Sequence, residues 1–489
     1  MGKKFHAAAL SVLSGILLSS CGDGGGDPPV VIPPNQPPTL TSATSVSTVE
    51  NATLAFQATA TDPDGNTLTF SIGGTDATRF SITASGLLNF LSAPDFDNPA
   101  DENGDNIYLI QISVSDGRTS VSQPLAVTVT NSREGIVVNR IFAGLEQTVT
   151  MSAIPGDSRL FVAEGDGSIY YFDPAARTRT LYTRVISKSG FRSAGLLNMA
   201  ASPDYANDGL LYVSLQTPTE TSVYALDRAK ADPGSASNSI EVATFPQQVL
   251  PITQAGWLGF APNGDLYYGR GAARYTNNDE GAHADDTYRG KLIRIRRNAS
   301  PGAPSQYSYD LAAKGLFGPA SGTFVGNTLL IGDTGLKVTG EIDRFDINGP
   351  VVSFGYPYRE GNTAVFPPEP AGLIAPVLEI AFGAGLKQSG GIILGPVYNG
   401  PITSLRGQLI FADAQLLNGN SMGSIWTIDA SQLLGATTTL PSAAYSLRKA
   451  DFTPNSGGMS AVRSFAATAD GKLFILDRGG SIYEVVAGS

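Results

Sequence analysis

Two acidic turns in the N-terminal third of the chain have the residue types and spacing of a site for a hard cation. The alternating residues are Asp62, Asp64 and Asn66 in the first turn and Asp101, Asn103 and Asp105 in the second. A glycine in each turn, Gly65 or Gly104, permits the sharp bend. Ca²⁺ takes about six to eight oxygen ligands, and alternate positions of a tight turn direct several oxygens to one point. The spacing therefore predicts calcium binding, with two solvated acidic turns as the alternative.

A second chemical feature is the single cysteine, Cys21, at the end of an apolar N-terminal segment. Lys3 and Lys4 form a basic head before that segment, which is the pattern of a cleavable signal and too short for a stable membrane span. The sequence Leu-Ser-Ser-Cys that ends at Cys21 resembles the lipobox of bacterial lipoproteins. The resemblance implies removal of residues 1–20 and lipidation of Cys21. The alternative is a secreted protein whose cysteine is incidental.

The segment 21–38 is rich in glycine and proline and is expected to be an extended spacer. In the lipoprotein class, an aspartate directly after the cysteine favours inner-membrane retention, and this chain has Gly22 there. We therefore expect a lipid-anchored protein of the cell envelope, at the outer membrane, on its periplasmic or surface face. Because the chain has one cysteine, no intramolecular disulfide is expected.

Composition narrows the class further. The formal net charge is −11, which argues against nucleic acid as a partner. Only 15% of the residues are charged, while the chain has 56 glycines and 31 prolines, a balance typical of short strands and many turns. An all-β protein with two domains is predicted.

Residues 39–133 read as short alternating strands separated by acidic turns, which predicts a Greek-key β-sandwich. The strands and turns resemble a cadherin-like repeat over the whole domain. The resemblance implies that Asp116 joins Asp62 and Asp64 at one pole, and that Glu50 with Asp95 or Asp97 faces the other. One departure is the linker after the domain, NSREG, which lacks the aspartates of cadherin linkers.

An internal repeat organises residues 135–489. Each copy has a turn, an apolar strand, a second turn and another apolar strand, and its first leucine marks its position: Leu160, Leu211, Leu266, Leu329, Leu409 and Leu473. Such units cannot bury both faces alone and stack around an axis, so a six-bladed β-propeller is predicted. Six unrelated hairpins in a large sandwich are the alternative.

Several segments of this repeat region, among them AGWLGFAPNGDLYYGRG and GGIILGPVYNGPITSLRGQLIFAD, resemble the soluble quinoprotein sugar dehydrogenases of the glucose/sorbosone dehydrogenase group. They occur in that group's order across residues 140–430. The resemblance implies pyrroloquinoline quinone (PQQ) over the central channel and a histidine that acts as general base. Histidine suits this role because its pKa lies near neutral pH.

The positions that would carry this chemistry differ from the family pattern. Thr253 stands where the histidine base is expected, and a threonine hydroxyl cannot take the substrate's proton at neutral pH. Phe317 and Gly318 replace the arginine and asparagine that contact the cofactor in the family. Ser202 replaces a further histidine of the family pattern. Because Thr253 occupies the position of the base, we assign no catalytic residue.

Other titratable residues give weaker signals. The one histidine after the signal, His283, is a possible base but is expected to be a solvated surface residue. The acidic candidates for bases or ligands are Asp265, Asp285, Asp286, Asp333 and Glu341, and their spacing singles out none of them. Lys387 and Arg406 are read as surface charges between blades.

Three functions from different classes fit the sequence. The first is a lipid-anchored binding or adhesion protein with a calcium-binding sandwich and a non-catalytic propeller, whose partner is a carbohydrate or another envelope or cell-surface protein. The second is a PQQ-dependent sugar dehydrogenase with an atypical base. The third is a structural protein of the envelope. Because fold alone does not carry activity, the altered site residues favour the first.

Overall fold

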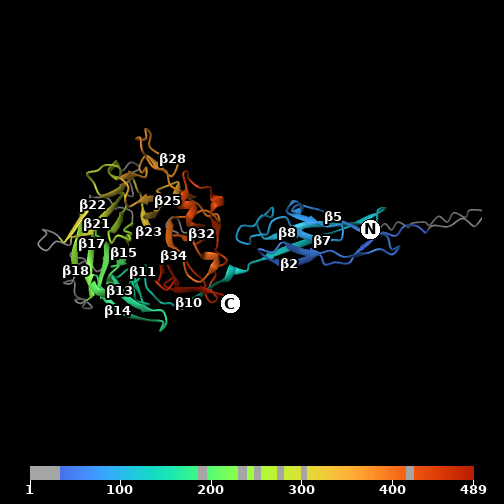
Figure 1. Cartoon of the computed structure of the whole chain (residues 1–489), viewed down its shortest axis with the longest axis horizontal. Helices are drawn as coiled ribbons and strands as arrows, with labels where there is room; N and C mark the ends of the chain where they lie inside the picture. Colours follow the sequence, from blue (N-terminus) through green and yellow to red (C-terminus); the bar gives the residue numbers. More distant parts are fainter. Residues whose placement is uncertain are drawn as a thin grey trace, which may run out of the picture.

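Nearly every described element is a β-strand, and the strands form a small sandwich and a larger ring of sheets (Figure 1). The computed structural model describes residues 33–185, 195–217, 219–228, 239–246, 255–272, 280–298, 306–414 and 423–488. The sandwich extends from the rim of the ring, beside β10 (Ile136–Phe142) and near the C-terminus. The predicted all-β architecture is confirmed.

The sandwich consists of one four-stranded and one three-stranded sheet with a short two-stranded pair. Its strands are β1 (Thr39–Leu40), β2 (Ser45–Val49), β3 (Leu54–Gln57), β4 (Ala60–Thr61), β5 (Thr69–Gly73), β6 (Phe80–Ile82), β7 (Leu87–Phe90), β8 (Ile107–Ser115) and β9 (Ser120–Thr130). The larger sheet has the order β2-β9-β8-β5 and the smaller β3-β7-β6, with β1 paired to β4. β2 runs parallel to β9, and the other pairs are antiparallel.

Strand β8 shows why these residues form a sandwich. Tyr108, Ile110 and Ile112 point inward and are buried, while Ile107 and Leu109 between them are exposed. Because side chains of a strand alternate between its faces, this pattern places one face on the core. The Tyr108 ring packs edge-on against Phe90, with 5.1 Å between ring centroids.

Six sheets form the ring. Their strands are β11 (Thr148–Ala153), β12 (Leu160–Glu164), β13 (Ser168–Asp173) and β14 (Thr178–Arg184) in blade 1; β15 (Gly195–Ala201), β16 (Leu210–Gln216), β17 (Glu220–Asp227) and β18 (Ser239–Pro246) in blade 2; β19 (Leu258–Phe260), β20 (Leu266–Arg270), β21 (Lys291–Arg297) and β22 (Tyr307–Lys314) in blade 3; β23 (Pro319–Val325), β24 (Thr328–Thr334), β25 (Thr339–Asp346) and β29 (Leu378–Ala381) in blade 4; β30 (Ile392–Val397), β31 (Gln408–Asp413), β32 (Ile425–Asp429) and β33 (Ser446–Leu447) in blade 5; and β34 (Val462–Ala467), β35 (Leu473–Asp477) and β36 (Ile482–Ala487) in blade 6. Strand β26 (Val352–Ser353) extends the third sheet, and β27 (Arg359–Glu360) pairs with β28 (Thr363–Ala364).

The predicted repeat corresponds to the second and third strands of each blade. All six marker leucines, from Leu160 to Leu473, lie in the second strand and are buried. The predicted six-bladed propeller is therefore confirmed. The ring closes because β10, directly after the sandwich, pairs with β36 as the outer strand of the last blade, from Ile136 opposite Ala487 onward.

Packing between blades supplies the core. Each neighbouring pair of blades shares one hydrophobic cluster, so six clusters stand around the axis. Phe161 of β12 belongs to the cluster between blades 1 and 2, whereas Val162 beside it belongs to the cluster between blades 6 and 1. Because both faces of a blade are covered, the second strands read as continuous apolar runs instead of alternating ones.

The sandwich and the propeller meet through a short polar junction. Arg133 donates from its guanidinium to the carbonyl of Asp451 at 3.2 Å and to Asn455 Oδ1 at 2.9 Å. Arg448 of the propeller forms an ion pair with Glu134 of the linker. The linker that leads into β10 is therefore held to the ring by charged contacts.

Helices contribute little. The described part of the chain contains the short α-helices α1 (Tyr205–Asp208) and α2 (Ala430–Gly435). Within that part, neither is long and apolar enough to cross a membrane.

Candidate functional site

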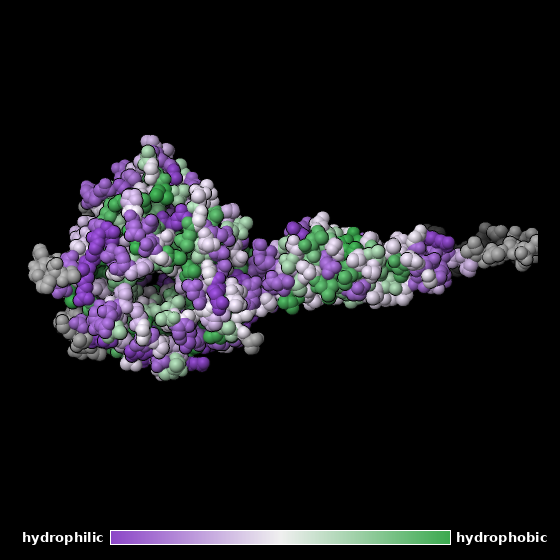
Figure 2. All heavy atoms as spheres, viewed as in Figure 1, coloured by the Kyte–Doolittle hydropathy of each residue, from purple (hydrophilic) through white to green (hydrophobic). Residues whose placement is uncertain are grey.

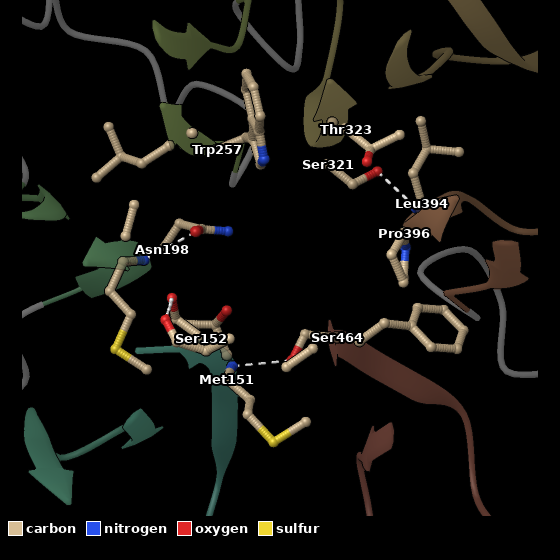
Figure 3. Close-up of a pocket in the computed structure, with 18 of the residues that line it drawn as sticks. Met151, Ser152, Asn198, Trp257, Ser321, Thr323, Leu394, Pro396 and Ser464 are labelled. Carbon is tan, nitrogen blue, oxygen red and sulfur yellow. Dashed lines mark hydrogen bonds between the residues drawn. The ribbon is translucent and has the colours of Figure 1, made fainter. Parts of the chain in front are cut away.

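A cavity of about 480 Å³ occupies the middle of the propeller, where the innermost strands of all six blades meet (Figure 3). The space-filling view shows the propeller face hollowed at this place (Figure 2). Side chains that point into the cavity include Ser152, Asn198, Trp257, Thr323 and Ser464. Because the blades repeat one strand order, the inner strands begin at one mouth of this channel and end at the other. We call these the N-terminal and C-terminal mouths.

Hydroxyl groups in the channel also join neighbouring blades. Ser464 Oγ accepts a hydrogen bond from the Met151 amide at 2.9 Å, and Ser321 Oγ accepts one from the Leu394 amide at 2.8 Å. Inner strands of different blades do not pair as a sheet, so side chains satisfy some of their backbone donors. These hydroxyl groups of the lining are therefore held in place by contacts between blades.

The ring of Trp257 forms part of the channel wall because glycines lie beside it. Gly322 of blade 4 packs against the indole, and a Cβ at that position would lie 2.8 Å from Trp257 Cζ2. The Phe324 ring lies 6.0 Å from the Trp257 ring, measured between centroids. A side chain larger than glycine at position 322 would displace the indole.

Arg463, near the start of β34, is the one charged side chain among the described residues that line the channel. Its Nε is buried without a hydrogen-bond partner. Burial, and then the nearby positive charge of Arg478, lower the pKa of Arg463. A positive charge without a compensating carboxylate is costly in a partly buried site, and a bound anion would relieve that cost.

Comparison with known proteins places both domains. Residues 145–309 match the family model Glucose / Sorbosone dehydrogenase. The propeller is a glucose/sorbosone dehydrogenase-type domain. Residues 35–130 match the model Bacterial Ig domain, so the sandwich is an Ig-type domain. Comparison with curated proteins found no match.

Solved structures agree with this assignment at the level of the fold. The PQQ-bound aldose sugar dehydrogenase of Streptomyces coelicolor is 20% identical, with a TM-score of 0.51 over 72% of this chain and 98% of that one. The apo-form aldose sugar dehydrogenase of Escherichia coli is 15% identical, with a TM-score of 0.52 over 72% and 99% of the two chains. At these identities the likeness concerns the fold alone.

In this dehydrogenase-type propeller, the residues expected at the cofactor serve the fold. Phe317 is 5% exposed and packs against Tyr356, with 4.9 Å between ring centroids. The amides of Phe317 and Gly318 both donate to the carboxylate of Asp333. Ser202 Oγ donates to Asp208 Oδ2 at 2.7 Å in the turn that follows β15. The predicted base position, Thr253, lies outside the described residues, as does Cys21.

Asp333 belongs to a set that the sequence reasoning missed. Buried carboxylates close the second strands of four blades: Glu164, Asp333, Asp413 and Asp477. Each accepts a backbone N–H from the segment that leads into the inner strand of its own blade. The signal was present, because each is the fourth residue after a marker leucine, where blades 2 and 3 have Leu215 and Arg270 instead. These carboxylates position the segments at the N-terminal mouth.

Blade 4 buries two further acids, Glu341 and Asp343, on the strand next to Asp333. Burial raises the pKa of Asp333 to about 7, and burial together with neighbouring carboxylates raises the pKa values of Glu341 and Asp343. Both oxygens of Asp343 lack hydrogen-bond partners. These acids lie within the blade and are not part of the channel lining.

His283, expected to be a solvated surface residue, is partly buried. Its Nδ1 lies 3.0 Å from Ser353 Oγ, and its ring packs edge-on against Tyr358. Burial, followed by the charges of Lys314 and Lys291, lowers the pKa of His283. The residue does not line the channel, and its hydrogen bond holds a loop beside β26.

The other polar candidates also have local roles. Lys387 donates to the carbonyls of Ser442 and Tyr445, and Arg406 donates to the carbonyl of Gly400. Neither lines the channel. Of the remaining acidic candidates, Asp265 is half-buried close to Arg296, whereas Asp285, in an ion pair with Lys314, and Asp286 are exposed.

At the N-terminal pole of the Ig-type domain, the structure brings the first predicted calcium turn together with Asp116. Asn35 Nδ2 donates to Asp116 Oδ2 at 2.8 Å, and the Gln36 amide donates to Asp64 Oδ2 at 2.7 Å. Asn66 Nδ2 donates to Asp62 Oδ1 at 3.2 Å. Hydrogen bonds from the Thr119 amide and Asn35 lower the pKa of Asp116. One oxygen of this pole, Asp62 Oδ2, is buried without a partner.

The second predicted turn closes on its own backbone. The Asp105 amide donates to Asp101 Oδ2 at 2.9 Å, and Asn103 Nδ2 donates to Asp105 Oδ2 at 2.9 Å. Glu50 accepts from the amides of Phe96 and Ser132.

Asp97 lies near Asp451 at the junction with the propeller, and burial and then that neighbour raise its pKa. Within the described ranges, no group of three or more histidine, cysteine, aspartate or glutamate side chains has an arrangement that would hold a metal ion.

Proposed function

We propose that the propeller channel binds a small organic ligand without oxidising it. The supporting observation is the lining: the described residues around the cavity include no aspartate, glutamate, histidine, lysine, cysteine or tyrosine. Transfer of hydride from a hydroxyl carbon requires a base that takes the hydroxyl proton. Arg463 keeps its own proton at neutral pH, and a threonine at position 253 does not accept one. The described lining of the channel therefore offers binding groups and no base.

The proposal includes a membrane tether at Cys21, with residues 21–38 as the spacer. Two or three acyl chains would give stable anchoring, because each buried CH₂ contributes about 0.8 kcal/mol. The lipobox-like sequence and the Gly/Pro-rich segment after it support this proposal. The binding module would then act at the cell envelope, at the outer membrane, with a carbohydrate or an envelope or cell-surface protein as its partner.

We also propose calcium at the N-terminal pole of the Ig-type domain, where it would stiffen the domain for adhesion or binding. The unpartnered Asp62 Oδ2 supports a cation there, beside amide and carboxylate oxygens of Asn35 and Asp64. The other acidic turn, at Asp101, has its carboxylates engaged by backbone amides, which makes it the weaker candidate.

A PQQ-dependent sugar dehydrogenase is the second candidate function. The observation that favours it is Arg463, a cation at the N-terminal mouth with an unpartnered Nε. PQQ accepts hydride when it is bound, but it is polyanionic and needs several cationic partners. The described residues supply this single guanidinium, and Phe317 and Gly318 serve the fold, so the fit is incomplete and no chemical step follows from it.

One experiment separates the two functions. The mature full chain is mixed with PQQ and Ca²⁺, and reduction of an artificial electron acceptor is followed with a panel of aldoses. We expect no turnover above the level without protein, for the wild type and for Thr253→Ala alike. Turnover that depends on protein, quinone and sugar together would overturn the non-catalytic proposal.

A further inference from the structure

The channel lining changes character from one mouth to the other. In the N-terminal half of the channel, the inner strands contribute the polar or charged residues Thr150, Asn198, Ser321 and Arg463, beside the larger apolar side chains of Trp257 and Ile393. The polar or charged residues come from four different blades. A ligand that enters this end meets polar groups from most of the ring.

The C-terminal mouth is richer in apolar residues, although the hydroxyls of Ser152 and Thr323 lie near it. The lining residues at or just beyond the ends of the inner strands are Pro155, Pro203, Phe260, Phe324, Pro396 and Ala467. Phe260 and Phe324 are half-buried residues of the lining, and their rings also pack against the hydrophobic clusters between blades. When a ligand covers apolar surface that faces water, the binding free energy becomes more favourable by about 25 cal/mol for each Å² covered.

The charge of the channel lining indicates which polar group the ligand carries. The protein is acidic overall, yet the described lining carries one positive and no negative side chain. Arg463 lines the cavity, its Nε–H is buried without an acceptor, and a planar guanidinium matches a carboxylate in geometry. A neutral hydroxyl would accept that hydrogen bond but would leave the charge uncompensated.

We propose that the channel binds an organic carboxylate with an apolar body. Its carboxylate pairs with Arg463 at the N-terminal mouth, and its apolar part extends toward Phe260 and Phe324. This inference rests on the proposed binding function and specifies its ligand class. The volume of about 480 Å³ lies within the range of small-molecule sites, roughly 300–1,000 Å³, and accommodates an arylalkanoate or a medium-chain fatty acid.

The test uses isothermal titration calorimetry on the mature full chain with three probes that share one body: 4-phenylbutyrate, 4-phenylbutanamide and 4-phenylbutanol. We expect 4-phenylbutyrate to bind at least about tenfold more tightly than the amide, because a charge-assisted hydrogen bond is stronger than a neutral one. Arg463→Gln should abolish this preference, and Arg463→Lys should retain part of it. Phe324→Ser should weaken 4-phenylbutyrate and leave the preference in place.

Arg184→Gln is the matched control, since Arg184 is half-exposed at the end of an outer strand and does not line the channel. Equal affinity for the acid and the amide, an unchanged preference in Arg463→Gln, or no binding of any phenylalkyl probe at millimolar concentration would each overturn the ligand class. If neutral sugars bind while the carboxylate does not, the ligand class fails and the binding function stands. Quinone-dependent turnover in the preceding assay would instead contradict the binding function itself.

Discussion

At the scale of single residues, buried carboxylates position the backbone at the N-terminal mouth of the channel. Asp333 and its counterparts accept backbone N–H groups of the segments that lead into the channel. A carboxylate that accepts backbone donors in a buried place satisfies amides that no strand partner reaches. The shape of the N-terminal mouth therefore depends on residues that never touch the cavity.

The buried acids of blade 4 predict a pH dependence of stability. A carboxyl whose pKa is raised in the folded state favours folding below its unfolded pKa, about 4, and loses that contribution as pH rises through the folded value. The pKa of Asp333 is about 7 and that of Asp343 is raised, so the melting temperature should fall between about pH 4 and pH 7. Asp343→Asn should make this fall in melting temperature smaller. The difference should be about 2–4 °C for each kcal/mol by which the pH-dependent loss of unfolding free energy is reduced.

Thermal unfolding followed by circular dichroism across this pH range measures the effect. Asp286→Asn is the control, because Asp286 is exposed. A fall of the same size in Asp343→Asn and in the wild type would show that Asp343 keeps its charge in the folded protein.

The residue types of the site were predicted better than their places. The sequence shows that Phe317 and Gly318 cannot contact an anion with charged side chains, but not that Phe317 packs on Tyr356 inside the fold. Arg463 carries no motif that singles it out, since its importance comes from being the lone charge among inner strands of six blades. That property arises only when residues more than three hundred positions apart meet at one axis.

At the scale of elements, the poles of the Ig-type domain differ in which oxygens are already engaged. The carboxylates of the turn at Asp101 accept from its own amides, and its unpartnered oxygen is the side-chain amide oxygen of Asn106. The turn at Asp62 is completed by the segment at Asn35 and keeps one unpartnered carboxylate oxygen. A cation would compensate that oxygen and join the turn to the segment before β1. Binding to the folded state alone raises stability with ion concentration.

We therefore expect Ca²⁺ to raise the melting temperature of the Ig-type domain within the mature full chain, and a chelator to lower it. Asp64→Asn should reduce this response, and Asp105→Asn in the other turn should leave it unchanged. The measurement is differential scanning calorimetry with either Ca²⁺ or chelator. Identical melts in the two conditions would rule out the proposed site.

Regular elements followed from the sequence because their signals are local. The marker leucines predicted the second strand of every blade, and alternation predicted β8. The closing strand β10 was not identified as part of the last blade, since its partner β36 lies at the other end of the chain. Pairing over such a separation leaves no local pattern, although Val138 and Ile141 are as apolar as any blade residue.

At the scale of the whole molecule, the described fold begins after the segment that would carry the lipid. The described chain begins at the end of the Ig-type domain that lies farthest from the propeller (Figure 1). The segment 21–38 that would follow the lipid is rich in glycine and proline, a composition typical of an extended spacer. Anchoring and folding should therefore be separable.

Replacement of Cys21 tests this separation. In bacteria that express the full chain, the wild type should partition into the detergent phase of a Triton X-114 extract, and Cys21→Ser should move to the aqueous phase. The melting temperature of the purified Cys21→Ser protein should equal that of the wild type. Aqueous partitioning of the wild type would contradict lipidation, and unchanged detergent partitioning of Cys21→Ser would assign the anchor to another segment.

The position of β10 has a mechanical consequence. This strand closes the ring and is also the first propeller element after the Ig-type domain, so tension on the N-terminal segment passes into the seam of the ring. Within the seam itself, the pair Ile136–Ala487 is the one nearest to the Ig-type domain. Arg133 and Glu134 lie one step earlier and are held by Asp451 and Arg448 of the propeller. These contacts should transfer part of the tension to the loop that contains Arg448 and Asp451 before the pairing of β10 with β36 bears it.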